Sequence, residues 1–186
     1  MNFPVKTFIA LFRGINVGGK NILPMKALVH MLQEIGLSNI RTYIQSGNVV
    51  FQSDRSDKPE LLDKIGIQIK NRFGFRPQIV LLSAGELREA IRLNPYQDSV
   101  SDPKSLHLYF LNARPVNPDF ELLESMTSKG ERFRLIGPVF YLHAPDGVGR
   151  SKLAANIEKG LGVPATARNW RTITQINAMI TGSGEK

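Results

Sequence analysis

The sequence contains no cysteine and only three histidines, and these shortages exclude several kinds of chemistry. A chain without thiols has no disulfide scaffold, no thiolate nucleophile and no cysteine-ligated zinc. The three histidines lie far apart, at positions 30, 107 and 143, and form no metal-binding motif. We therefore expect neither a metal centre nor another cofactor.

The N-terminal region also lacks a long hydrophobic run. Its apolar stretch "TFIALF" has six residues before Arg13, whereas a membrane span needs about 20 and a secretory core is also longer. We expect no association with a membrane and a cytoplasmic protein of bacterial type. The 186 residues are 42% hydrophobic, which is enough for a core in one or two units.

Acidic residues are outnumbered by basic ones, and the net charge is +8. Residues 1–97 carry 13 Lys and Arg against 7 Asp and Glu, a balance of +6, and residues 98–186 carry 11 against 9, a balance of +2. This excess attracts anions, nucleic acids included, but a basic surface that serves only solubility has the same composition.

One order of elements occurs twice in the hydrophobic pattern. It runs strand, helix, strand, strand, helix, strand, and a further helix follows. The expected strands are 5–12, 40–45, 48–53 and 77–83, then 105–113, 132–137, 139–144 and 164–168. The expected helices are 24–36, 58–73 and 83–93, then 117–128, 150–162 and 169–180.

Two of these helices have recognisable starts: Asp57 is a cap before Pro59, and Ser83 and Glu86 have capping-box spacing. We also expect Asn117 to cap the helix of the second half, with Pro118 inside it. The βαββαβ order is typical of a ferredoxin-like unit. We predict an α+β protein with two ferredoxin-like subdomains, 1–97 and 98–186, whose sheets are antiparallel or mixed.

The segment "RGINVGGKN", residues 13–21, has the glycine and lysine spacing of a nucleotide-binding phosphate loop. Such a loop needs a helix that starts at the lysine, a following Ser or Thr, and an acidic strand end elsewhere. Here Asn21 follows the lysine, and Pro24 places the helix start near residue 24. The sequence therefore excludes a phosphate loop. The glycines either form a nest for an anion or serve only the geometry of the connection.

Three segments resemble the family called domain of unknown function 1697: "ALFRGINVGGKN" at 10–21, "RTYIQSGNVVF" at 41–51 and "ATARNWRTI" at 165–173. The resemblance extends over nearly the whole chain and implies a compact bacterial α+β protein. It implies no established activity, but it favours a functional role for the polar residues of these loops. These candidate ligand-binding residues are Arg13, Asn16, Lys20, Asn21, Gln45, Ser46, Asn48, Arg168 and Asn169.

In a ferredoxin-like unit we expect the end of the first strand and the turn between the second and third to lie at opposite ends of neighbouring strands. One pocket made from all three segments is then difficult to build. A second interpretation stays open, in which Gln45, Ser46 and Asn48 bind the backbone of their own turn and Asn169 caps the last helix. In that case Trp170 anchors this helix.

The second half suggests another surface. Alternation places His107 with Tyr109 on one face and Tyr141 with His143 on one face, so neighbouring strands could form a platform for stacked bases. The alternative is that these rings pack between the two subdomains.

The leading hypothesis is a module that binds an anionic ligand, either a nucleotide-like molecule or nucleic acid, through the glycine-rich basic loop. An enzyme acting on a phosphorylated or carboxylated metabolite and a structural or partner-binding protein are the alternatives. The sequence shows no catalytic motif, and it indicates no oligomeric state.

Overall fold

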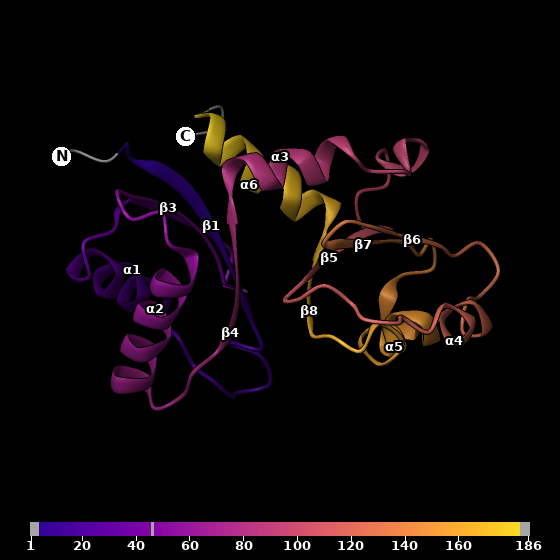
Figure 1. Ribbon diagram of the computed structural model, residues 1–186, viewed down its shortest axis with the longest axis horizontal. Coiled ribbons are helices and arrows are strands. Elements are labelled where there is room, and N and C mark those ends of the chain that lie inside the picture. The colour runs from indigo at the N-terminus through magenta and orange to yellow at the C-terminus, as the bar shows by residue number, and fades with distance from the viewer. Residues whose placement is uncertain (1–3, 46, 183–186) are drawn as a thin grey trace. The chain divides into compact units, whose positions relative to one another are not determined.

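A computed structural model describes residues 4–45 and 47–182, and within them the predicted order of elements is confirmed. Two four-stranded antiparallel sheets are each accompanied by helices, so the protein is α+β (Figure 1). The chain forms two compact units, residues 1–88 with 175–186 and residues 89–174. The second unit thus begins nine residues before the boundary expected from the sequence (98 − 89 = 9), and the end of the last helix groups with the first unit.

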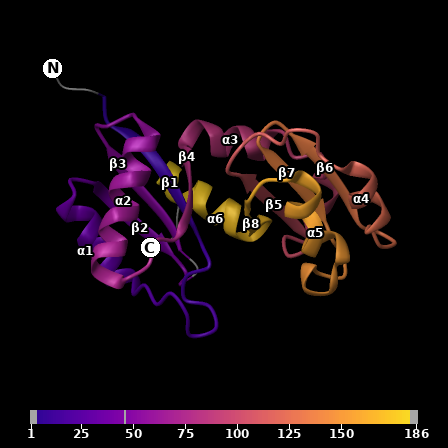
Figure 2. The ribbon, with the colours of Figure 1, turned by 60° about the horizontal axis from the view of Figure 1, so that its bottom comes forward.

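In the first unit, the sheet order is β2-β3-β1-β4, as in a ferredoxin-like fold. Helices α1 and α2 cover one face of this sheet (Figure 2). The elements are β1 (Lys6–Arg13), α1 (Met25–Glu34), β2 (Ser38–Tyr43), β3 (Asn48–Ser53), α2 (Lys58–Phe73), β4 (Gln78–Ser83) and α3 (Ala84–Arg92), whose last residues lie in the second unit.

The second unit repeats this arrangement with the sheet order β6-β7-β5-β8. Helices α4 and α5 cover one face of its sheet (Figure 1). Its elements are the 3-10 turn η1 (Gln97–Ser99), β5 (Leu106–Leu111), α4 (Phe120–Ser125), β6 (Arg132–Ile136), β7 (Val139–His143), the 3-10 turn η2 (Val148–Arg150), α5 (Lys152–Leu161), β8 (Ala165–Asn169) and α6 (Trp170–Thr181), whose end lies in the first unit.

Both cores follow from strand alternation. In β1, Phe8, Ala10 and Phe12 belong to the core shared with α1 and α2. Tyr109 and Leu111 take the equivalent places in β5, against α4 and α5. Because the intervening residues of β1 and β5 are buried as well, these two central strands are buried on both faces.

Side-chain caps set the starts of two helices as predicted. The Asp57 carboxylate accepts a hydrogen bond from the backbone N–H of Glu60 at 3.0 Å, at the start of α2. The Ser83 hydroxyl and Glu86 form the reciprocal bonds of a capping box at the start of α3.

The expected start of α4 was wrong. Asn117 lies before the helix with a φ of 56°, and the cap is Asp119, whose carboxylate accepts from the N–H of Leu122 at 2.9 Å. Asparagine tolerates left-handed backbone angles better than most residues, and the residue before a proline avoids helical ones. A cap residue takes extended backbone angles, which Asn117 lacks, and Asp119 is an equally good cap.

Candidate functional site

The loop between β1 and α1 is a small hairpin. The N–H of Lys20 donates to the carbonyl oxygen of Val17 at 3.1 Å, and Gly18 and Gly19 between them have φ values of 58° and 72°. Two central residues with positive φ are typical of a type I′ turn, which glycine adopts without steric cost. Helix α1 begins at Met25, five residues after Lys20 (25 − 20 = 5), so this loop is not a phosphate loop at a helix N-terminus.

Asparagine side chains fix the base of this hairpin. Asn16 donates from Nδ2 to the carbonyl oxygens of Leu23 and Gln45, both at 2.9 Å, and its Oδ1 accepts from the N–H of Leu23 at 2.7 Å. Asn21 donates from Nδ2 to the carbonyl oxygen of Gly14 at 3.0 Å. Both asparagines have positive φ, at 55° and 51°. Each asparagine therefore contributes both a left-handed backbone angle and a hydrogen bond across the loop.

The first two motifs lie side by side, and the expectation that they are at opposite ends of the strands was wrong. Leu11 of β1 pairs with Asn48 of β3, and the N–H of Phe12 donates to the carbonyl oxygen of Gly47 at 2.8 Å. Because the two strands are antiparallel, the end of β1 lies beside the beginning of β3. The bond from Asn16 to Gln45 then connects the hairpin to the β2–β3 turn.

Within that turn, Asn48 is buried and donates from Nδ2 to the carbonyl oxygen of Tyr43 at 3.0 Å, so it binds the turn itself. The exposed Gln45 offers its backbone carbonyl to Asn16. Ser46 lies outside the described residues.

The charged groups of the site are Arg13 and Lys20. Arg13 is half-buried at the end of β1 and donates to Gln78 Oε1 at 3.2 Å. Lys20 is exposed at the hairpin, and among the described residues its ammonium group has no hydrogen-bond or ion-pair partner. The hairpin thus presents a positive charge that the described part of the protein does not neutralise.

Sequence reasoning missed the exposed aliphatic side chains around these charges. Val17 is 67% exposed, Ile22 55% and Ile44 53%. Ile44 also has a φ of 51°, a left-handed angle that costs a β-branched residue about 1–2 kcal/mol. A signal was available, because β-branched residues are unusual among the glycines and asparagines of tight loops.

The third motif belongs to the second unit. Arg168 is half-buried in β8 and donates to the carbonyl oxygen of Ala167 at 2.8 Å. Burial lowers its pKa to about 10, which leaves the guanidinium charged at neutral pH. Asn169 Oδ1 accepts from the N–H of Thr172 at 2.9 Å, so this residue caps α6 as the second interpretation expected, and Trp170 is buried beside it.

The suggested aromatic and histidine platform does not exist. His107 pairs with Leu142 and Tyr109 with Phe140, so Tyr141 and His143 point to the other face of the sheet. The ring of Tyr109 packs edge to face against Phe140, with centroids 6.1 Å apart. Tyr141 is fully buried, and its hydroxyl donates to the carbonyl oxygen of Ala90 at 2.7 Å. Tyr109 and Tyr141 are therefore interior residues that cannot stack bases, whereas His107 and His143 are half-buried on opposite faces.

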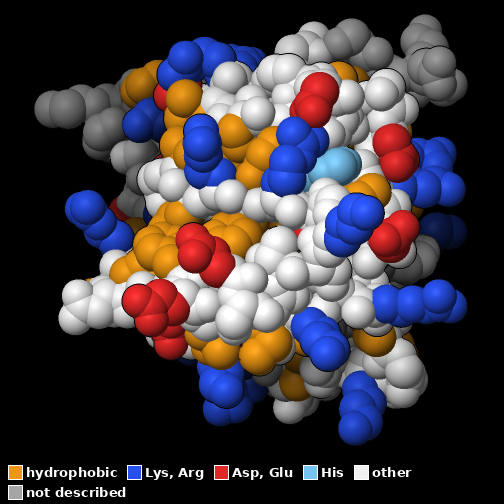
Figure 3. Space-filling model, turned by 90° about the vertical axis from the view of Figure 1, so that its right-hand side faces the viewer, with side chains coloured by type: hydrophobic (Ala, Val, Ile, Leu, Met, Phe, Trp, Pro, Cys, Tyr) orange, Lys and Arg blue, Asp and Glu red, His pale blue; other side chains and the backbone are white. Residues whose placement is uncertain are grey.

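The described residues contain neither a metal-binding cluster of side chains nor a helix that could span a membrane. Within 4–45 and 47–182, no cluster of three histidine, aspartate or glutamate side chains could hold a metal ion. None of the helices described there combines the length and hydrophobicity required to span a bilayer. Figure 3, a view from the side of α4 and β6, shows basic and acidic side chains interspersed around hydrophobic patches.

Comparisons with known proteins agree with this architecture. A solved structure of "conserved bacterial protein SP0830" from Streptococcus pneumoniae is 26% identical and superposes with a TM-score of 0.77. The similarity covers 95% of this chain and 99% of that one. None of the curated proteins compared matches the chain. The model of the family described as "Protein of unknown function (DUF1697)" matches residues 5–141, which include the hairpin and the β2–β3 turn, and the chain belongs to this family.

Proposed function

We propose that the protein is a cytoplasmic binding module whose first unit binds a phosphate-bearing anion, as part of a nucleotide-like molecule or of a nucleic-acid backbone. One observation carries the proposal: Lys20 presents an uncompensated charge on a hairpin that hydrogen bonds hold in one shape. Because the backbone that carries Lys20 is held in place, ligand binding has to order little more than the lysine side chain.

Arg13 supplies a second positive charge at the base of the same hairpin. The side chains of Asn16, Asn21 and Asn48 bind carbonyl groups of the loop and the turn. Their role is to hold the backbone of the site in place, and they need not contact the ligand. The exposed Val17, Ile22 and Ile44 offer apolar contacts to the sugar or base that accompanies a phosphate. The site in the first unit does not require Arg168 or Asn169.

Binding is favoured over catalysis by the composition of the two segments. Residues 13–21 and 43–48 contain no Asp, Glu or His, so they have no side chain that usually acts as a general acid or base near neutral pH. They do contain Arg and Lys, which bind phosphate by charge and by hydrogen bonds.

The test compares Lys20→Gln with Lys70→Gln, which removes an exposed lysine from the last turn of α2 in the same unit. Fluorescence anisotropy would follow a labelled single-stranded oligonucleotide, and calorimetry would follow inorganic pyrophosphate and ATP. We expect Lys20→Gln to weaken binding about threefold to tenfold at low salt, and Lys70→Gln to leave it nearly unchanged.

The dependence on salt distinguishes the two sources of phosphate. Binding to a nucleic-acid backbone falls steeply with salt, and Lys20→Gln should reduce the slope of log K against log salt by about 1. Binding of pyrophosphate or ATP without binding of the oligonucleotide identifies a small molecule. No binding of any probe, or equal effects of the two substitutions, would refute the proposal.

A further inference from the structure

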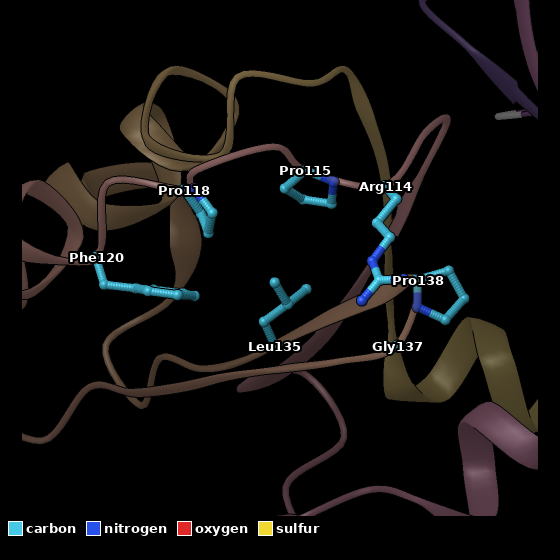
Figure 4. A pocket seen from close by; sticks show the side chains of 7 residues that line it. All are labelled: Arg114, Pro115, Pro118, Phe120, Leu135, Gly137 and Pro138. Atoms are coloured by element: carbon cyan, nitrogen blue, oxygen red, sulfur yellow. The ribbon is translucent and has the colours of Figure 1, made fainter.

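A cavity in the second unit provides a separate candidate site. It has a volume of about 590 Å³ and lies where the loop after β5 and the start of α4 meet the β6–β7 turn (Figure 4). Its lining residues are Arg114, Pro115, Pro118, Phe120, Leu135, Gly137 and Pro138. This volume is within the usual range for small-molecule sites, and an apolar lining with few polar groups is also typical of them.

The walls of the cavity are held in place by backbone hydrogen bonds. The N–H of Leu111 donates to the carbonyl oxygen of Pro138 at 3.0 Å, which joins the end of β5 to the β6–β7 turn. The N–H of Asp119 donates to the carbonyl oxygen of Gly160 at 2.7 Å, which joins the end of the loop to α5. Three prolines in the lining also fix their own φ angles. The cavity is therefore formed before any ligand binds.

The packing of α4 against α5 leaves little room for the wall to move. A Cβ atom added at Gly160 would lie 2.6 Å from Leu123 Cγ, so the two helices are in close contact at this glycine. Leu123 is fully buried in the core of the unit. Phe120, three residues before it, is 39% exposed and points its ring into the cavity (Figure 4).

Arg114 gives the cavity one charge. Figure 4 shows its guanidinium turned inward toward Leu135, opposite the ring of Phe120. Among the described residues, the guanidinium has no hydrogen-bond or ion-pair partner, and Arg114 is the only charged residue of the described lining. A guanidinium beside apolar walls favours an anion, and its planar fork matches a carboxylate.

We propose that this cavity binds a small monoanionic carboxylate with an aromatic or branched aliphatic body. The carboxylate pairs with Arg114, and the body lies on Leu135 between the ring of Phe120 and the prolines. One negative charge matches the one positive charge, and the apolar side chains of the lining favour the organic body of a carboxylate over an inorganic ion. The ligand class follows from this complementarity.

The test uses naphthoate, its neutral counterpart naphthamide and inorganic phosphate, with binding to the full chain followed by calorimetry. We expect saturable binding of naphthoate, about tenfold weaker binding of naphthamide, and no competition by phosphate. Arg114→Gln should weaken naphthoate binding about tenfold or more and remove the preference over naphthamide. Phe120→Ala should weaken both aromatic probes about fivefold to tenfold.

Two matched variants control for changes elsewhere in the unit. Arg150→Gln removes an exposed arginine that does not line the cavity, and Val116→Ala truncates an apolar side chain that is 82% exposed. Both should bind naphthoate as the unaltered protein does. Circular dichroism would show that all four variants are folded, as the exposure of the altered side chains leads us to expect. Absence of saturable binding, full binding by Arg114→Gln, or equal losses in Arg150→Gln would overturn the proposal.

Discussion

Gly47, in the β2–β3 turn, has no room for a side chain beside β1. Its φ is 76°, and a Cβ atom added there would lie 2.6 Å from both Phe12 Cβ and Ile15 Cδ1. Ile15 Cδ1 is the end of a flexible side chain, although the residue is only 1% exposed. Phe12 Cβ is fixed to the backbone of β1, so this contact cannot be relieved unless the strand or the turn moves.

The expected effect of Gly47→Ala is a loss of about 3 kcal/mol in the free energy of unfolding. The left-handed backbone angle contributes about 1 kcal/mol, and overpacking against Phe12 contributes about 2 kcal/mol. For a chain of this length, such a loss lowers the melting temperature by about 6–12 °C. The natural control is Gly18→Ala, because Gly18 also has a positive φ but a Cβ there meets no atom within 4 Å. It should lose only about 1 kcal/mol.

Urea unfolding followed by circular dichroism measures both variants. Hydrogen exchange of the β1 and β3 amides adds a measurement confined to the first unit, which a chain of two units requires. Similar losses in Gly47→Ala and Gly18→Ala would show that the contact with Phe12 contributes nothing, and that Gly47 is not closely packed against β1.

Two further predictions follow from single residues. Asn16→Ala removes three hydrogen bonds from the base of the hairpin. We expect it to lower the free energy of unfolding by about 2 kcal/mol and to speed hydrogen exchange of the Leu23 amide. Unchanged exchange of this amide would contradict the prediction. Burial raises the pKa of Tyr109 from 10.0 to about 12, so the stability linked to its neutral hydroxyl is complete below about pH 10 and is lost as the pH rises toward 12. Between pH 10 and 11, Tyr109→Phe should therefore lose about 1 kcal/mol less than the unaltered protein in urea unfolding, and equal losses would argue against this burial.

The sequence predicted the elements well because most local signals agreed with the tertiary structure. Asp57 and Ser83 cap their helices as expected, since these contacts involve only neighbouring residues. The start of α4 was misplaced because Asn117 and Asp119 are both good caps. Asn117 adopts a left-handed φ and the amide of Asp119 donates to Gly160, which is distant in sequence, and no local pattern indicates either feature.

The candidate site was harder to predict because it depends on strand register. Alternation shows which residues of one strand share a face, but it does not show which residues of the neighbouring strand join them. For this reason the pairing of Tyr109 with Phe140 could not be read from the sequence. The bond from Asn16 to Gln45 crosses 29 residues (45 − 16 = 29), and no local pattern indicates it.

The two proposed sites occupy equivalent places in the repeated fold. In each unit, the end of the first strand donates a backbone hydrogen bond to the turn of the following hairpin, from Phe12 to Gly47 and from Leu111 to Pro138. Both turns contain a glycine with positive φ, Gly47 and Gly137.

The difference between the sites lies in what occupies this place. In the first unit the buried side chain of Ile15 packs against Gly47 and occupies the space beneath the loop. The charge of Lys20 is exposed on the hairpin. In the second unit, prolines, Leu135 and Phe120 surround a cavity, and Arg114 points into it. The same backbone arrangement thus supports an exposed basic hairpin in one unit and an open cavity with a single charge in the other. Because the two sites share no residue, Lys20→Gln and Arg114→Gln should each impair binding of one probe class and leave the other unchanged.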